Sequence, residues 1–506
     1  MPPFLKTRPA LAWLALCLLL GGAASLASHT DANWDLQNYH LYAPFAALHG
    51  RLGRDYFVAG FQGYLNPTLD MPYFLLKLVL LRHHPMVVAF LAGLPFGALV
   101  FVTISIAHAL LPDAPLLLIV PVAAIGLTGS TTLSEVGTTF GDLTVASVLL
   151  AGLWGGLRYD AMPVRAGVAA GLGLGLATGL KFTAAVFAPG MALVVLLAAW
   201  GGGVRGILRA GVAFGVAGAA GFLASWGWWG ATLWRHFRNP FYPLLGRIFI
   251  TPGSIATHPQ DGRFFPHSLL EWLFFPAWWI EGWTYTASEE SLRDPRFLLA
   301  GIALLAGVAV AARRGVPRRV LALWGFVACG YVAWLLVFSI LRYAVAIEVL
   351  TGLVIWTGLA LPSPPLGSPS RRMIVAVLLL VGCVAATKPM GWGRIDYDQT
   401  LIGQPVPSLP PHALVLVDGR PISFVMPYLP TRGRRFIRID ELPMVAPERT
   451  LVHALLAAGD PPWLLTNQPL HPKLAQWHLA IDPVGCRKIH TPVQSTIQLC
   501  PLKPSP

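Results

Sequence analysis

The sequence predicts an all-α polytopic membrane bundle of about 11 transmembrane helices, followed by a small C-terminal extracytoplasmic α/β domain. Of the 506 residues, 55% are hydrophobic and only 12% are charged, and the mean hydropathy is +0.62. Apolar runs near the ~20 residues that a spanning helix needs recur through residues 1–389. Residues 390–506 instead alternate between short strand-like runs and one helical pattern. We therefore divide the chain into a transmembrane domain, 1–389, and a terminal domain, 390–506.

The first apolar run, 9–28, follows the basic residues Lys6 and Arg8. We interpret it as a retained helix with its N-terminus in the cytoplasm. A cleaved signal peptide ending near SLAS is the alternative. The other predicted spans are 86–110, 115–128, 142–157, 166–180, 182–200, 208–232, 297–312, 320–340, 343–361 and 373–388.

Loop charges predict how the bundle is oriented. The loops on the side of the N-terminus contain Arg158, Arg165, Arg205, Arg209, Arg313, Arg314, Arg318, Arg319, Arg371 and Arg372. Their acidic residues are only Asp113 and Asp160, which fits the positive-inside rule. The loops 29–85, 129–141 and 233–296 and the terminal domain then face the periplasm of a bacterial inner membrane. The net charge of +13 is explained by this bias, so we predict no nucleic-acid partner.

The terminal domain shows a strand and helix pattern. Strand-like runs are 412–419, 434–440, 461–467, 486–490 and 495–500, and 447–459 has a helical pattern that ends at Gly459. Cys486 and Cys500 fall in the last two runs, which we expect to pair as a hairpin. In an oxidising compartment the two cysteines would form a disulfide. Two free, buried thiols are the alternative.

The segment 29–73 concentrates polar and ionisable residues directly after the first apolar run. Such groups are costly beside a bilayer, so their concentration indicates a site. Asp31 and Asp35 are spaced i, i+4, which puts them on one face if the first helix continues. We expect Asp35, with Asp31 as the second candidate, to act as a general base on a hydroxyl group. The alternative is that either carboxylate is a solvated helix end or cap.

We expect the substrate to contact further polar side chains. Those in the first loop are Asn38, Tyr39, His40, Arg54, Gln62 and Asn66, and those later in the chain are Asp142, Lys181, Arg342 and Tyr343. Lys181 and Arg342 are candidates for a cationic clamp on phosphate. Lys181 interrupts an apolar run, although a snorkelling role is the alternative. Asp142 could instead cap the N-terminus of its helix.

No metal site is predicted, and we expect that no cofactor is required. The cysteine and histidine spacings match no zinc motif. Glu135 and Asp142, together with Asp35, are the acidic residues that would hold a divalent cation if one binds.

Several of these residues stand in an order that resembles a known family. Asp35 and Tyr39 match the Asp-Glu-x-x-Tyr pattern in the first outer loop of GT-C glycosyltransferases, with Leu36 in place of Glu. Asp142 resembles their second acidic position, and Lys181 stands in their Gly-rich helix and Lys-x-Thr turn. RNPFYP at 238–243 and LRYAVAIE at 341–348 are also similar to segments of bacterial members, including those like the dolichyl-phosphate-mannose-protein mannosyltransferases.

The resemblance implies a membrane glycosyltransferase that uses a polyprenyl-phosphate-linked sugar. The acceptor would be a lipid, a glycan or a protein at the periplasmic face, and Asp35 would be the base of an inverting transfer. Two other functions remain open. One is a lipid-linked oligosaccharide polymerase or ligase, and the other is a membrane transporter of glycolipids, a class that tends to show internal repeats.

Overall fold

Each predicted span overlaps at least one helix. The computed structural model describes residues 7–255, 261–281, 286–360, 368–440, 446–457, 459, 461–494 and 496–505. Lys6 lies outside this part of the chain. The helices of the bundle are α1 (Thr7–Leu26), α4 (Pro85–Ala92), α5 (Leu94–Leu110), α6 (Leu116–Leu127), α8 (Asp142–Arg158), α9 (Pro163–Leu180), α10 (Ala188–Ala199), α11 (Gly203–Phe237), α13 (Arg296–Arg314), α14 (Arg318–Val337), α16 (Thr351–Ala360) and α17 (Pro369–Ala386).

The length and composition of the helices identify this chain as a multi-pass membrane protein. Among the described residues, 6 helical segments are long and apolar enough to cross a membrane, or 7 if one bent pair forms a single span. One segment, Phe182–Phe237, contains both α10 and α11, which η6 (Trp200–Gly202) separates and which pack together. Several helices at the positions of predicted spans, such as α6, are shorter than this criterion requires. The total of eleven transmembrane helices therefore stays a prediction.

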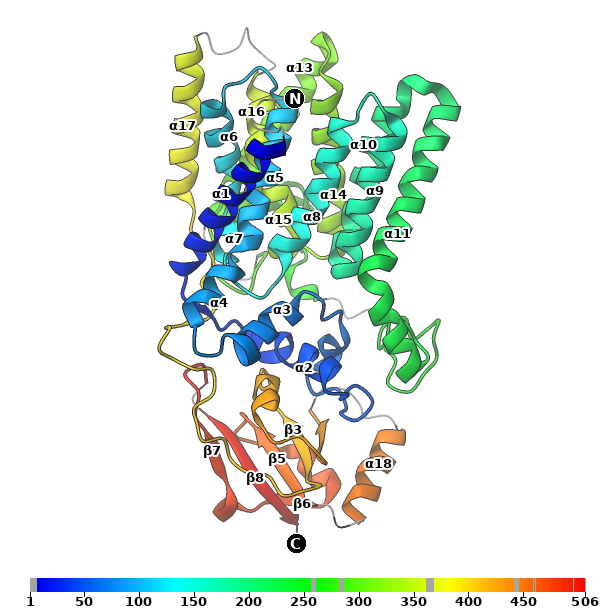
Figure 1. Ribbon diagram of the computed structural model, residues 1–506, viewed down its shortest axis with the longest axis vertical. Coiled ribbons are helices and arrows are strands. Elements are labelled where there is room, and N and C mark those ends of the chain that lie inside the picture. The colour runs from blue at the N-terminus through cyan, green and yellow to red at the C-terminus, as the bar shows by residue number, and fades with distance from the viewer. Residues whose placement is uncertain are drawn as a thin grey trace.

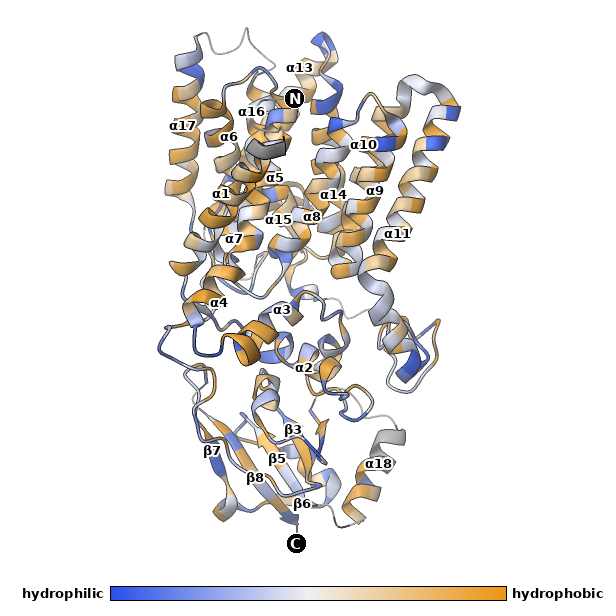
Figure 2. Ribbon diagram, in the orientation of Figure 1, coloured by the Kyte–Doolittle hydropathy of each residue, from blue (hydrophilic) through white to orange (hydrophobic). Residues whose placement is uncertain are grey.

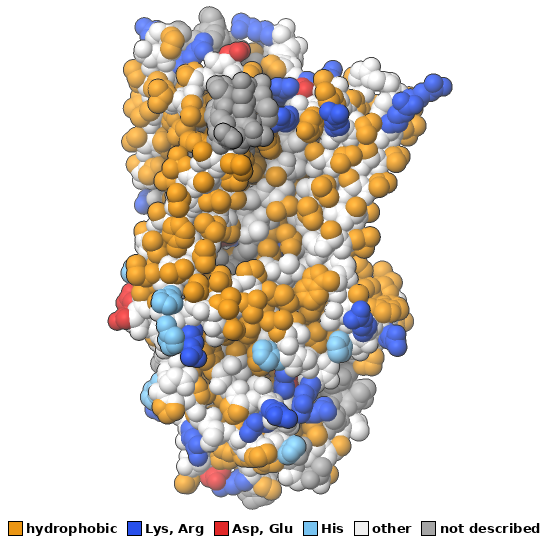
Figure 3. Space-filling model, viewed as in Figure 1, with side chains coloured by type: hydrophobic (Ala, Val, Ile, Leu, Met, Phe, Trp, Pro, Cys, Tyr) orange, Lys and Arg blue, Asp and Glu red, His pale blue; other side chains and the backbone are white. Residues whose placement is uncertain are grey.

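The surface of the bundle fits a lipid environment. Hydrophobic residues dominate its helices in Figure 2, and large apolar side chains such as Leu117 and Leu305 are exposed. Lys and Arg side chains gather at the end of the bundle opposite the sheet (Figure 3). At that end, arginines occupy the last turn of α13 and the first positions of α14. Close packing inside the bundle depends on small residues, since a Cβ added at Gly175 of α9 would collide with the backbone of α11.

A layer of short helices lies between the bundle and the sheet (Figure 1). It contains η2 (Leu36–His40), α2 (Tyr42–Leu48), η3 (Gly60–Tyr64), α3 (Asp70–Phe74) and η4 (Leu75–Leu80) from the first outer loop. The later loops of the bundle form further short helices: α7 (Ser130–Ser134), η5 (Phe182–Phe187), η7 (Gly262–Phe264), α12 (Leu269–Phe274), η8 (Phe275–Ile280), η9 (Leu341–Ala344) and α15 (Val345–Glu348). Of these, α7 and α15 lie at the level of the bundle (Figure 1).

The terminal domain is a small α/β unit at the far end of the molecule (Figure 1). Its strands are β3 (Leu414–Asp418), β4 (Arg435–Arg438), β5 (Pro462–Thr466), β6 (Leu479–Ile481), β7 (Arg487–Ile489) and β8 (Ile497–Pro504). They form a sheet of order β4-β3-β5-β8-β6, with β7 also pairing with β8. Strand β3 is parallel to β4 and β5, whereas β8 is antiparallel to β5, β6 and β7. Helices α18 (Ala446–Ala457), η10 (Ser423–Tyr428), η11 (Pro472–Trp477) and η12 (Pro483–Gly485) complete it.

The predicted disulfide is confirmed. Cys486 directly precedes β7 and Cys500 lies in β8, and the structure joins their sulfurs. The strands pair with Arg487 opposite Leu499, which places the two cysteines side by side.

The first outer loop docks on the terminal domain through buried arginines. Arg438 of β4 donates to the backbone carbonyls of Phe57 and Val58. In return, Arg51 of the loop donates to the carbonyls of Thr431 and Arg434. A second connection follows α1, where β1 (Thr30–Asp31) pairs with β2 (Arg394–Ile395). The terminal domain therefore holds the loop that contains Asp35.

Candidate active site

The site is centred on an ion pair between two distant parts of the chain. Arg342 of η9 donates from Nη1 to Asp35 Oδ2 at 2.5 Å. The hydroxyl of Tyr39 donates to the same oxygen at 3.2 Å. Asp35 Oδ1 accepts no hydrogen bond from the described residues, and the Asp35 side chain is 9% exposed. One carboxylate oxygen is thus committed to Arg342 and the other is left for a ligand.

Local helix geometry positions the residues that follow Asp35. They form η2, a π-helical turn, a form that often marks functional sites. Asn38 is fully buried, yet neither its amide nitrogen nor its amide oxygen has a partner within the described structure. His40 Nδ1 lies 2.7 Å from Asp70 Oδ1, while its Nε2 has no partner within that same part.

A second ion pair lies beside the first. Lys181 Nζ donates to Asp142 Oδ1 at 2.6 Å and to the carbonyl of Phe140 at 3.2 Å. Lys181 stands where α9 ends, because its backbone is extended and η5 begins at the next residue. Asp142 is the first residue of α8, after Gly141 with φ +78°. That left-handed turn favours glycine and directs the Asp142 carboxylate toward Lys181.

Aromatic rings connect the two ion pairs. The Tyr343 ring centre is 5.0 Å from Lys181 Nζ and 5.1 Å from Arg342 Cζ. The Phe140 ring centre is 4.8 Å from Arg342 Cζ. The Tyr343 hydroxyl also accepts a hydrogen bond from Arg342 Nη2 at 3.3 Å. Arg342 and Lys181 therefore both lie near the Tyr343 ring. Each of the two cations pairs with one carboxylate.

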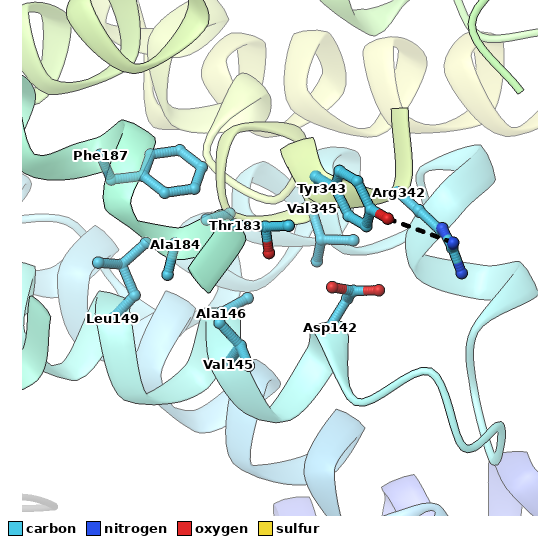
Figure 4. Close-up of a pocket in the computed structure, with 11 residues that line it drawn as sticks. Asp142, Val145, Ala146, Leu149, Thr183, Ala184, Phe187, Arg342, Tyr343 and Val345 are labelled. Carbon is cyan, nitrogen blue, oxygen red and sulfur yellow. Dashed lines mark hydrogen bonds between the residues drawn. The ribbon is translucent and has the colours of Figure 1, made fainter. Parts of the chain in front are cut away.

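A small pocket opens beside Asp142, Arg342 and Tyr343 (Figure 4). Asp142 and Arg342 flank it with Thr183 and Tyr343, so one part of the wall is polar. The rest is apolar and consists of Val145, Ala146, Leu149, Ala184, Phe187, Val345 and Ala346. Because Leu149 lies about two turns along α8 from Asp142, the pocket becomes apolar toward the interior of the bundle. This arrangement suits a ligand with an anionic head and a hydrocarbon tail.

The balance of charges keeps Asp35 ionised. Burial acts to raise the pKa of Asp35, but the charge of Arg342, then those of His40 and Lys181, outweigh it, and the pKa is lowered. Burial raises the pKa of Asp70, against the opposing effect of His40. Asp35 is therefore a carboxylate in the resting site.

Asp31 has a different environment from Asp35. It is 1% exposed, and its oxygens accept hydrogen bonds from Asn33 and from the backbone and hydroxyl of Thr139. These contacts join the first outer loop to the loop 129–141. Asp31 therefore has hydrogen-bond partners at both oxygens, whereas Asp35 has them at one among the described residues.

The other predicted substrate contacts are divided between the site and its surroundings. Asn66 donates to the carbonyls of Gly179 and Ser225, which secures the loop near the end of α9. Gln62 lies in η3, and its side-chain oxygen is buried without a partner in the described part. Arg54 makes no side-chain contact with Asp35, Asp142 or Arg342 among the described residues. Its backbone instead bonds to Arg51, next to the terminal domain.

Two buried acids that the sequence analysis did not select support the site. Glu348, at the end of α15, accepts hydrogen bonds from the backbone of Thr131 and Thr132 and from the Thr132 hydroxyl. Asp294 accepts one from the backbone of Ser130 and pairs with buried Arg296 at 3.0 Å. Both carboxylates therefore stabilise the N-terminus of α7. A glutamate within an apolar run was the signal that could have identified Glu348.

The acidic residues do not form a recognisable metal centre. Within the described ranges, no three His, Cys, Asp or Glu side chains come close enough to hold a metal ion. Asp142 instead pairs with Lys181, and Asp35 pairs with Arg342.

Comparisons with protein-family models, with curated proteins and with solved structures found no match for this chain.

Proposed function

We propose that this protein is a glycosyltransferase of GT-C type that moves a sugar from a polyprenyl-phosphate carrier to an acceptor hydroxyl. One observation supports this most: a pocket with apolar inner walls is lined by the cation Arg342, which pairs with the carboxylate of Asp35, and by Asp142, which pairs with the cation Lys181. A lipid-linked phosphate sugar needs these three features together. Its tail needs hydrocarbon, its phosphate needs positive charge, and its attacking hydroxyl needs a base.

In the proposed reaction, Asp35 accepts the proton of the acceptor hydroxyl. The hydroxyl oxygen forms a bond to the anomeric carbon, while the bond from that carbon to the phosphate oxygen breaks. The electron pair of the broken bond leaves with the phosphate, whose charge Arg342 and Lys181 offset. Attack opposite the leaving group inverts the anomeric centre.

Arg342 has a second role in this proposal, because it contacts both the base and the pocket. In the resting site its charge lowers the basicity of Asp35. When a donor phosphate enters the pocket, Arg342 shifts part of its hydrogen bonding from Asp35 to the phosphate. Asp35 then becomes a stronger base only when the donor is bound, which limits wasteful reactions with water.

The bilayer and the loop charges support the proposed location. The arginines at one end of the bundle mark the cytoplasmic side under the positive-inside rule. The site and the terminal domain then lie at the periplasmic face of a bacterial inner membrane. The acceptor is a lipid, a glycan or a protein, and no cofactor is required. The eleven predicted spans are part of this proposal.

Purified protein in lipid nanodiscs tests the function directly. It would be incubated with a panel of radiolabelled undecaprenyl-phosphate hexoses and pentoses, and with envelope lipid extract as the acceptor source. We expect one donor to release undecaprenyl phosphate and to label an acceptor. The matched control is Arg319→Lys, which changes a similar Arg–Asp pair outside the site, with Asp160 as the partner. Failure of every donor with well-folded protein would argue against this function.

A further inference from the structure

Glu135 differs from the buried acids around it. It follows α7 in the loop 129–141 and is 1% exposed. Neither of its carboxyl oxygens has a hydrogen-bond partner in the described part of the chain. Glu348, which lies against the same loop, accepts three hydrogen bonds. The structure therefore provides ample donors for one glutamate and none for the other.

A buried carboxylate without donors is unfavourable in its ionised form. The group avoids this cost by keeping its proton, which leaves a neutral carboxylic acid. Burial, and after it the negative charge of Asp142, raise the pKa of Glu135 well above its usual value. The geometry and the electrostatics thus agree on the protonated form.

The surroundings of Glu135 show which ligand its proton could meet. Arg394 donates to the carbonyls of Ser134 and Val136, the residues on either side of Glu135. It makes no hydrogen bond to the Glu135 carboxyl group. After burial, the charges of Asp142, Lys181, Arg342 and Glu348 act on the pKa of that group, and the first three belong to the site.

We propose that Glu135 is a neutral carboxylic acid that donates a hydrogen bond to an anionic phosphate oxygen held by Lys181 and Arg342. This inference rests on the proposed function, which places the donor phosphate at these two cations. A neutral acid adds a hydrogen bond to the phosphate without adding negative charge. An ionised Glu135 would repel the phosphate and offer it no donor.

The proposal links phosphate binding to one proton. Since only the protonated form donates, affinity is full at low pH and falls as the pH rises through the raised pKa of Glu135. Other titratable or charged groups face the same region: Asp35, His40, Asp142, Lys181, Arg342, Tyr343 and Glu348. Their contribution persists when Glu135 is replaced, so the difference between two pH profiles isolates Glu135.

The first measurement concerns the resting protein and needs no substrate. Infrared difference spectroscopy of the full chain in nanodiscs, with Glu135→Gln as the comparison, detects the carbonyl band of a protonated carboxylic acid. We expect the wild type to show this band at neutral pH and the variant to lack it. Identical spectra would mean that Glu135 is ionised and would overturn the proposal, whatever the fate of the proposed function.

The second measurement is binding of the methyl ester of farnesyl phosphate, a diester whose own charge does not change near neutral pH. We expect Glu135→Gln, which keeps an N–H donor, to bind within about twofold of wild type and to lose the pH dependence. Glu135→Ala should bind about tenfold more weakly, the size of one hydrogen bond to a charged group.

Two results would contradict the second part of the proposal. If Glu135→Gln binds the diester as weakly as Glu135→Ala, an N–H donor does not replace Glu135. Binding would then depend on the negative charge of Glu135 and not on its proton. If Mg²⁺ restores binding in the wild type after chelation but not in Glu135→Gln, the residue is a cation ligand instead. A diester that the wild type does not bind would remove the proposed phosphate site, while the infrared band would still report the state of Glu135.

Discussion

Arg342 donates to Asp35 at 2.5 Å across 307 residues of sequence, and the same guanidinium borders the pocket. The ion pair joins the proposed base and the proposed phosphate-binding cation in one unit. Replacing Arg342 with Ala should lower transfer about 100-fold or more, because the leaving phosphate loses a charged donor. Lys at this position should restore only part of the activity, since it lacks the planar fork of guanidinium. Steady-state kinetics with the labelled donor would measure this, and wild-type turnover in Arg342→Ala would exclude the role.

Lys181 and Asp142 allow a test of the second cation. Lys181→Gln should raise the KM for the lipid-phosphate donor, because positive charge beside the phosphate is lost. Asp142→Asn releases Lys181 from its 2.6 Å ion pair and should leave donor affinity unchanged or stronger. A structural role alone would make the two variants equally defective, since both break the same pair. Parallel losses of donor affinity would therefore place the phosphate elsewhere.

Arg438 tests whether the terminal domain supports the first outer loop. Its side chain is buried and donates to the carbonyls of Phe57 and Val58. Arg438→Gln should destabilise the protein by about 1–3 kcal/mol, because buried acceptors lose their donors. Thermal unfolding in detergent and limited proteolysis of the loop would measure the effect. The exposed residue Arg432 is the matched control, and equal melting of both variants would show that the docking contact is weak.

The disulfide gives a prediction about stability alone. Cys486 and Cys500 are 14 residues apart, so the bridge should stabilise the fold by roughly 3 kcal/mol in the chain-entropy model. Replacing both with Ser should lower the melting temperature and leave specific activity at permissive temperature unchanged. Mass spectrometry of non-reduced protein checks the bond itself. Free thiols at both positions would contradict the bridge and the periplasmic location together.

Local sequence patterns predicted much of the secondary structure. Long apolar runs are recognisable because a spanning helix must satisfy its backbone internally and be apolar outside. The terminal strands were recognisable from short β-branched runs, and the two cysteines from their place in adjacent strands. The strand β6 was missed because LAI is too short to show a period.

The site was predicted only in part, because its contacts join distant segments. Asp35 and Tyr39 were selected together from one short motif, and the structure joins them by a hydrogen bond. The His40–Asp70 and Glu348–Thr132 contacts depend on tertiary packing and leave no spacing signal. The substrate contact of Arg54 stays a prediction, and its Nε is buried without a hydrogen-bond partner in the described part of the chain.

The most direct test of the proposed function is the transfer rate of Asp35→Asn. The substitution keeps the shape of the side chain but removes the carboxylate that would accept the proton. Purified wild-type, Asp35→Asn and Asp31→Asn proteins would be compared in nanodiscs with the same labelled polyprenyl-phosphate sugar. We expect Asp35→Asn to bind the donor and to lose transfer by at least about 100-fold, and Asp31→Asn to lose less. Transfer by folded Asp35→Asn at a rate near that of wild type would contradict the assignment of the base.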